Sequence, residues 1–134
     1  MRSPVANCRE ALPLDTHLIY WWMTADARLG IATQRIIAKS EIVVSTASIW
    51  EMVLKNAKGK LPLPQGSITE QLEAQGFALL PILPRHIEAA RSLICEHADP
   101  FDRLLIAQAY DERVTLLTRD AAILELGLDS VVKG

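Results

Sequence analysis

Short runs of apolar residues alternate along the chain with longer segments in which apolar residues recur at the helical period. Unbroken apolar runs of this kind are typical of strands in a parallel sheet that helices cover on both faces. The pattern predicts strands at residues 11–14, 42–44, 77–80, 114–117 and 130–132. It predicts helices at residues 16–23, 28–39, 48–57, 67–75, 84–94, 100–113 and 121–126. We therefore expect an α/β fold with a central, mostly parallel sheet.

The beginning of the chain is the least regular part of this pattern. Residues 1–11 carry no periodicity that predicts an element. The first predicted strand contains Pro13, which has no N–H to donate to a neighbouring strand, and this argues against a central position in the sheet. With 134 residues and no repeat, low-complexity segment or linker, residues 1–134 are expected to form a single domain.

Composition narrows the class of protein without naming its function. Half of the residues are apolar and 22% are charged, which is typical of a soluble globular protein. The longest apolar run, residues 18–23, is too short to cross a membrane, and Cys8 and Cys95 fit neither a metal motif nor a disulfide framework, so we expect a cytoplasmic protein. The net charge of −2 neither indicates nor excludes a nucleic-acid partner, because a nuclease gathers acids at its metal site and bases around it.

One predicted helix carries a charge at the edge of its apolar face. Asp99 and Pro100 are typical of a helix start. Asp102 follows in the first turn, on the same face as Leu105 and Ile106. A carboxylate placed where a helix enters the core is costly unless it is paired or binds a metal. Asp102 is therefore a candidate metal ligand.

Three further acids lie at or just beyond the ends of predicted strands. Asp15 follows the first strand, Glu51 lies one helical turn past the second, and Asp120 closes the strand that ends at Leu117. Sites in parallel sheets form at the carboxyl ends of strands. Carboxylates gathered there repel one another, and one or two Mg²⁺ ions would hold them together.

Each acid also has a structural explanation. Ser48 and Glu51 have the spacing of a capping box, and Asp15 and Asp120 each precede a predicted helix that they could cap. Asp102 could be a favourable first-turn charge. For each acid taken alone the two explanations are equally good, whereas the four together favour a metal site.

Other side chains offer weaker signals. His17, His86 and His97 show no ligand spacing, which favours surface or capping roles, and Ser45 and Ser48 lack a His/Asp pair for nucleophilic catalysis. No glycine-rich phosphate loop is present.

Two short groups of residues are candidates for the surface of the protein. Lys55, Lys58 and Lys60 are most simply a solvated face. Trp21 and Trp22 point about 100° apart on one helix, so we expect one in the core and the other partly exposed at a partner surface.

Five segments resemble motifs of the PIN domain, specifically of VapC-type toxins of bacterial toxin–antitoxin pairs. They are Leu14-Asp15-Thr16-His17, Ser48-Ile49-Trp50-Glu51, Gly59-Lys60-Leu61-Pro62-Leu63-Pro64, Asp99-Pro100-Phe101-Asp102-Arg103-Leu104-Leu105-Ile106-Ala107-Gln108-Ala109 and Thr118-Arg119-Asp120. The resemblance covers residues 14–132. It implies a three-layer α/β/α fold and an endoribonuclease that depends on Mg²⁺ or Mn²⁺, forms a homodimer and is held silent by a cognate antitoxin.

The resemblance also assigns the site. By position, the acidic quartet of the family falls on Asp15, Glu51, Asp102 and Asp120. We expect the hydroxyls of Thr16 and Thr118 to support these ligands. Arg103 and Arg119 are candidates for contact with an RNA phosphate, because a planar guanidinium suits phosphate.

The chain departs from the family at its start, and two other interpretations of the sequence remain open. Family members begin almost directly with a longer apolar strand that ends in the first Asp, whereas here residues 1–11 and Pro13 occupy that region. A catalytically inactive PIN-like binding module is one alternative, and the intact quartet argues against it. A receiver-like phosphoacceptor domain is the other, but it would need paired early acids and a late lysine, where this chain has Arg119.

Overall fold

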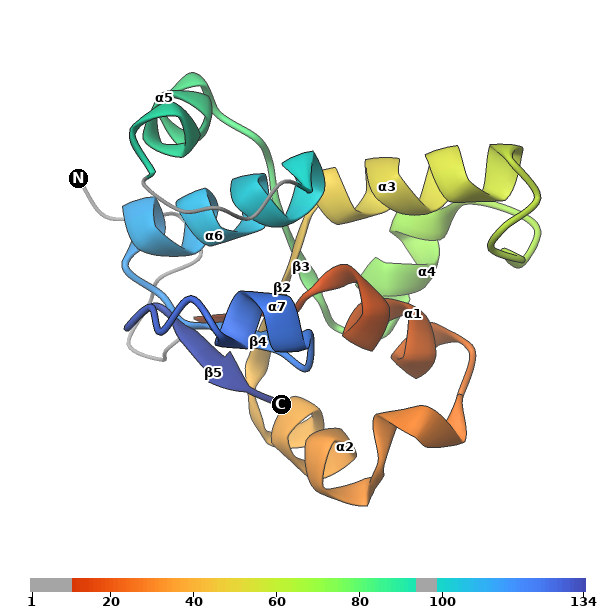
Figure 1. The fold of residues 1–134 in the computed structure, drawn as a ribbon. Coiled ribbons are helices and arrows are strands. Elements are labelled where there is room, and N and C mark those ends of the chain that lie inside the picture. The colour runs from red at the N-terminus through yellow and green to blue at the C-terminus, as the bar shows by residue number, and fades with distance from the viewer. Residues whose placement is uncertain (1–10, 94–98) are drawn as a thin grey trace.

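A computed structural model describes residues 11–93 and 99–134, so that Cys8, Cys95 and His97 lie outside the described ranges. In chain order the elements are β1 (Ala11–Pro13), α1 (Thr16–Met23), the 3₁₀ helix η1 (Ala27–Leu29), α2 (Ile31–Lys39), β2 (Glu41–Ser45), α3 (Thr46–Ala57), α4 (Ile68–Ala74), β3 (Ala78–Leu80), α5 (Pro84–Ser92), α6 (Pro100–Glu112), β4 (Leu116–Thr118), α7 (Ala121–Leu124) and β5 (Val131–Lys133). Figure 1 shows their arrangement. Within the described ranges, no helix has the length and apolar character needed to cross a membrane.

The strands form a parallel sheet that a single bridge holds together. β1, β2 and β3 pair in that order, and β4 pairs with β5, every pair being parallel. A parallel bridge between Leu14 and Leu117 joins β1 to β4. The strand order is therefore β3-β2-β1-β4-β5, and the predicted α/β fold with a parallel sheet is confirmed.

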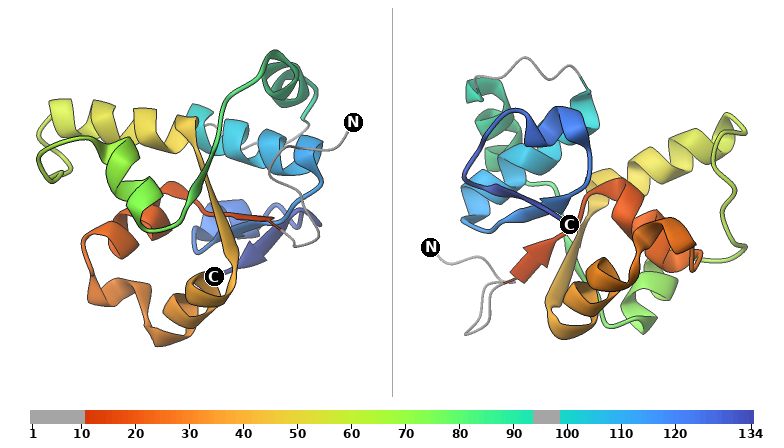
Figure 2. Two further views of the ribbon diagram at one scale, coloured as in Figure 1. Left: turned by 180° about the vertical axis from the view of Figure 1, so that it is seen from behind. Right: turned by 60° about the horizontal axis from the view of Figure 1, so that its bottom comes forward.

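Alternating side chains of β2 divide the interior into two hydrophobic clusters. Ile42 and Val44 belong to one cluster and Val43, between them, to the other. The first cluster also takes residues from α1, α2 and α4, and the second from α6 and α7. Helices therefore cover both faces of the sheet, which gives the expected three layers (Figure 2).

Pro13 argues against a central position for β1, yet the residues directly after it bond to β2 on one side and to β4 on the other. The N–H of Leu14 donates to the carbonyl of Val43 in β2 (3.4 Å), and that of Asp15 to the carbonyl of Leu117 (3.0 Å). Successive N–H groups of a strand point to opposite neighbours, so the nitrogen of Pro13 faces β4. It lies before the Leu14–Leu117 bridge, at the point where the pairing with β4 has not yet begun, and the missing donor is tolerated there.

The segment predicted as one helix over residues 28–39 is divided by Gly30. Gly30 has a φ of +80°, which ends η1 and begins α2. The inner face of this segment is formed by Leu29, Thr33 and Ile37, whereas Ile36 is exposed. The break shifts the helical phase, and the buried face shifts with it.

The two adjacent tryptophans are both half-buried, so the expectation that one of them lies in the core is wrong. Trp22 packs on Phe77, with the ring centroids 5.9 Å apart. The guanidinium carbons of Arg28 and Arg119 lie 5.3 and 5.5 Å from the ring centroid of Trp21. Cation–π contacts of this kind cover a ring while its edge stays in contact with water.

Candidate active site

Three strand ends and the helices that follow them bring the predicted acids to one edge of the sheet. Because β1, β2 and β4 are parallel, their carboxyl ends lie at the same edge. Asp15 follows β1, Asp120 follows β4, and Glu51 lies on α3, which begins directly after β2. α3 contacts both α1 and α6, and the beginning of α6 lies beside the beginning of α3 in Figure 1.

Asp15 is buried and its carboxylate is held by two donors. It is the N-cap of α1, where Oδ1 accepts the N–H of His17 at 2.7 Å. Oδ2 accepts a short hydrogen bond from the hydroxyl of Thr118 at the end of β4. Both oxygens are therefore fixed in orientation, one by the backbone of α1 and the other by the end of β4.

Thr118 also positions Asp120. Its hydroxyl oxygen accepts the N–H of Asp120 at 3.0 Å, so that one side chain links the two predicted acids. Asp120 is the N-cap of α7, and its Oδ1 accepts the N–H of Ala122 at 2.8 Å and of Ile123 at 3.2 Å. The capping roles considered for Asp15 and Asp120 are confirmed, and both caps place a carboxylate at the sheet edge.

Glu51 is buried inside α3 and is not part of a capping box. The N-cap of α3 is Ser45, whose hydroxyl accepts the N–H of Ala47 at 3.0 Å. The predicted cap at Ser48 is wrong, since Ser48 lies in the first turns of the helix and accepts a hydrogen bond from the hydroxyl of Thr16 at 2.9 Å. Thr16 thus ties the beginning of α1 to the helix that carries Glu51.

The two carboxylate oxygens of Glu51 have different surroundings. Oε2 lies 2.7 Å from Nζ of Lys55, one helical turn further along α3. Oε1 is buried and has no hydrogen-bond partner among the described residues. A buried carboxylate oxygen without a donor is unfavourable, and a bound cation is one way in which it can be satisfied.

Asp99 and Asp102 have distinct roles at the start of α6. Oδ1 of Asp99 caps the helix, accepting the N–H of Phe101 at 2.8 Å and of Asp102 at 3.1 Å. The carboxylate of Asp102 lies in the first turn, half-buried, beside the completely buried Leu105 and Ile106 of the same face. The predicted helix start is confirmed.

The quartet shares an edge of the sheet without close clustering. Among the described residues, one group of three potential metal ligands has its ligand atoms within 4.8 Å of one another. It consists of His86, Asp111 and Glu112. This cluster lies at the other end of α6. Arg85 already pairs with both of its acids, at 2.7 Å from Asp111 and 2.6 Å from Glu112. These carboxylates in turn raise the pKa of the Arg85 guanidinium above its usual value, so a positive charge of the chain itself already offsets part of their negative charge.

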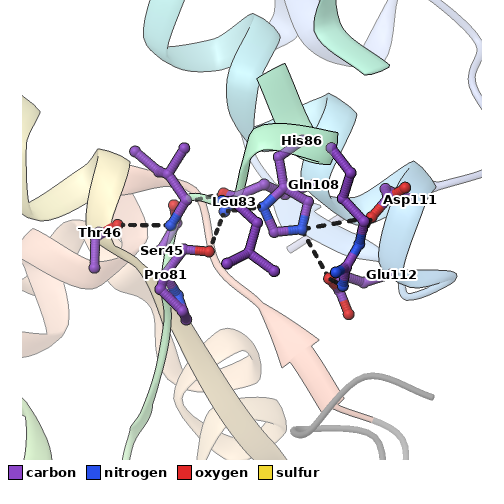
Figure 3. A network of polar contacts seen from close by, with 10 residues as sticks. Ser45, Thr46, Pro81, Leu83, His86, Gln108, Asp111 and Glu112 are labelled. Carbon is purple, nitrogen blue, oxygen red and sulfur yellow. Dashed lines mark hydrogen bonds and ion pairs between the residues drawn. The ribbon is translucent and has the colours of Figure 1, made fainter. Parts of the chain in front are cut away.

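His86 belongs to a buried polar network between α5, α6 and the end of β2 (Figure 3). Its Nδ1 accepts the N–H of Leu83 at 2.9 Å, which makes it a cap of α5, and its Nε2 lies 2.7 Å from Oε2 of Glu112. Gln108 continues the network, accepting the hydroxyl of Ser45 at 2.5 Å. The capping role considered for His86 is confirmed, although the ring is buried and not at the surface.

Both predicted phosphate-binding arginines are engaged within the chain. Nη2 of Arg103 donates to the carbonyls of Ala90 and Leu93 at the end of α5 (3.1 and 3.2 Å). Arg119 donates to the carbonyl of Leu29 (2.5 Å), to the hydroxyl of Thr33 (2.7 Å) and to two further carbonyls. These contacts favour structural roles for both guanidinium groups over the expected contact with phosphate.

Two further residues make contacts that the sequence patterns did not indicate. Lys55 is more than part of a solvated face, because it pairs with the buried Glu51. Gln108 joins α6 to the N-cap of α3. The i,i+4 spacing of Glu51 and Lys55 is visible in the sequence, whereas no local pattern predicts that Gln108 meets Ser45.

Comparisons with known proteins place this geometry in context. The sequence profile of the PIN domain matches residues 13–127. Over 111 residues the chain is 31% identical to Ribonuclease VapC22 of Mycobacterium tuberculosis, covering 80% of this chain and 85% of that protein. Among solved structures, a toxin–antitoxin complex from Klebsiella pneumoniae matches with a TM-score of 0.61 at 20% identity, covering 90% of this chain and 95% of its own. VapBC2 from Rickettsia felis, bound to a DNA fragment from its promoter, matches with a TM-score of 0.59 at 12% identity, covering 92% of this chain and 97% of its own.

Proposed function

Because this chain belongs to the PIN domain family, we propose that it is a metal-dependent endoribonuclease and the toxin of a toxin–antitoxin pair. Its similarity to Ribonuclease VapC22 supports the reaction, and its structural similarity to a toxin–antitoxin complex and to VapBC2 supports an antitoxin partner. Residues 1–134 would act as one domain in the cytoplasm, as a homodimer or bound to the antitoxin.

The observation that carries the proposal is the buried Oε1 of Glu51, which has no hydrogen-bond partner among the described residues. It lies on the helix that follows β2, at the edge of the sheet to which Asp15 and Asp120 also belong. All of these donors are carboxylate oxygens, the ligands that Mg²⁺ and Mn²⁺ prefer. The donor set therefore fits a hard divalent cation.

In this proposal Asp15, Glu51, Asp102 and Asp120 hold the cation, directly or through water. When bound, a divalent cation lowers the pKa of a water ligand and offsets negative charge on the phosphodiester as it is attacked. A carboxylate of the quartet that does not contact the cation directly accepts the proton of the attacking water. The hydroxyl of Thr118 donates its only hydrogen to the carboxylate of Asp15 and so keeps that carboxylate in one orientation.

The proposal is tested by incubating the purified protein with total RNA and mapping the new ends. We expect cleavage with Mg²⁺ or Mn²⁺ and none with EDTA, and we expect Glu51→Gln to be inactive. Glu73→Gln, which removes an exposed acid from α4, is the matched control and should cleave normally. Cleavage that persists in EDTA, or that survives Glu51→Gln, would contradict the proposal. A folded protein that cleaves nothing but binds an antitoxin would support the inactive alternative instead.

A further inference from the structure

The ion pair between Glu51 and Lys55 joins a buried group to an accessible one. The side chain of Glu51 is 4% exposed and that of Lys55 is 39% exposed, with 2.7 Å between Oε2 and Nζ. Pairs at i,i+4 on a helix surface usually join two solvated side chains and contribute little. Here the lysine side chain reaches inward to a carboxylate that water hardly contacts.

A helix-stabilising salt bridge would leave a simpler arrangement. A carboxylate that served only to pair with lysine would be expected to have both oxygens solvated or bonded to donors. Instead Oε2 is held by the ammonium, whereas Oε1 is buried without a partner among the described residues. The pair thus divides the two oxygens of one carboxylate between two environments.

We propose that Lys55 is a positioning residue of the metal site, an inference that rests on the proposed function. Its ammonium holds Oε2 of Glu51 and leaves Oε1 as the single oxygen that this residue offers to a divalent cation. Lys55 also supplies the positive charge that the buried carboxylate requires before a cation arrives.

This arrangement sets the sign of the effect on metal binding. A cation bound at Oε1 shares its carboxylate with a fixed positive charge, and like charges at this separation repel. Lys55 therefore weakens metal binding while it stabilises the metal-free protein. Its removal makes both oxygens available to the cation and adds one net negative charge to the site.

The experiment compares Lys55→Met with the wild-type protein by titrating each with Mn²⁺ in a calorimeter, without RNA. We expect the Kd for Mn²⁺ to fall by roughly threefold to tenfold, since the removed unit charge is close to the site but partly screened by solvent. We also expect the Tm of the metal-free protein to fall, because the buried carboxylate of Glu51 loses its partner. If the salt bridge were merely structural, its removal would lower the Tm and would leave the Kd for Mn²⁺ unchanged or raise it.

Matched variants separate the inference from general charge effects. Lys58→Met removes an exposed positive charge just beyond α3, and Lys55→Arg keeps the charge next to Glu51, so both should bind Mn²⁺ as the wild type does. Should Lys55→Met fail to fold, Lys55→Gln keeps a hydrogen-bond donor without the charge and carries the same expectation. Wild-type or weaker affinity for Mn²⁺ in Lys55→Met and Lys55→Gln overturns the role of Lys55 alone. No binding of Mn²⁺ to the wild type overturns the proposed function.

Discussion

The hydroxyl of Thr118 donates a hydrogen bond to the carboxylate of Asp15, which lies 103 positions earlier in the chain. The same hydroxyl oxygen accepts the N–H of Asp120. The contact forms at the bridge between β1 and β4, where the two halves of the sheet meet. Thr118 therefore couples the closure of the sheet to the orientation of two acids at its edge.

Thr118→Val removes this hydroxyl and preserves the shape of the side chain. We expect it to destabilise the protein by about 1–3 kcal/mol, because the buried carboxylate of Asp15 loses a donor. We also expect weaker binding of Mn²⁺, since Asp15 is no longer fixed in orientation. Urea unfolding measures the first effect and a Mn²⁺ titration the second.

The control for this variant is Thr24→Val, which removes an exposed hydroxyl that bonds to the carbonyl of Tyr20 in its own helix. It should change neither quantity appreciably. If Thr118→Val matched the wild type in both stability and metal affinity, the link to Asp15 would have no part in organising the site.

Conservative replacements of the quartet test its role in cleavage. Asp15→Asn, Glu51→Gln, Asp102→Asn and Asp120→Asn should each lower the rate of RNA cleavage by about 10²–10³-fold, on the scale of losing a group that stabilises charge in the transition state. Asn caps helices as well as Asp does, so the caps of α1 and α7 should survive. Asp99→Asn is the internal control, because Asp99 caps α6 through its backbone contacts. An inactive Asp99→Asn beside an active Asp102→Asn would reverse the assignment of the two.

Divalent metal should stabilise the folded protein by mass action. At a free Mn²⁺ concentration of one hundred times the Kd, the expected gain is about 2.7 kcal/mol, or roughly 10 °C in Tm for a domain of this length. The gain should be smaller in Asp102→Asn, which removes one negative charge from the site. Differential scanning fluorimetry with and without EDTA measures both, and a Tm indifferent to saturating Mn²⁺ would argue against a metal site.

Much of the fold could be predicted from the sequence because many of its elements depend on residues that are close together in the chain. The side chains of the apolar run in β2 alternate between the two hydrophobic clusters, as expected of a strand that helices cover on both faces. Asp15, Asp99 and Asp120 cap helices as their positions before helical segments suggested. In each case the side chain bonds to its own neighbours in the chain.

Contacts between distant segments were the part that sequence could not predict. The sequence shows that Pro13 has no N–H, and this favoured an edge position. It does not show which neighbouring strand the nitrogen faces, because that depends on the tertiary structure. Ser48 fitted a capping box, but the chain turned into the helix three residues earlier, at Ser45. For the site itself, the position of Glu51 one turn past the end of β2 was predictable, whereas the sequence left open at which edge of the sheet Asp102 lies. The pairing of the buried Glu51 with Lys55 was not predicted.

The network around Gln108 should be a source of stability. Gln108 accepts the hydroxyl of Ser45 at 2.5 Å and donates to the carbonyl of Pro81 at 3.4 Å, all in the interior between β2 and α6. Gln108→Leu leaves that hydroxyl without its acceptor and should lower the free energy of unfolding by about 1–3 kcal/mol. Urea unfolding checks this against Gln34→Leu on the exposed side of α2, which should unfold at the wild-type midpoint. Equal midpoints for both variants would show that the network contributes nothing.

Arg119 offers a direct test between a structural role and the contact with RNA phosphate that its sequence position suggested. Its guanidinium donates to the carbonyls of Leu29 (2.5 Å) and Gly134 (3.1 Å) and to the hydroxyl of Thr33 (2.7 Å), and these bonds tie the end of β4 to α2. Arg119→Met should therefore lower the free energy of unfolding by about 2 kcal/mol, the scale of hydrogen bonds from a charged donor, while KM for RNA changes little. The exposed Arg35 on α2 provides the charge-matched control, since Arg35→Met should leave stability unchanged. A stable Arg119→Met protein with a strongly raised KM would instead assign this guanidinium to the substrate.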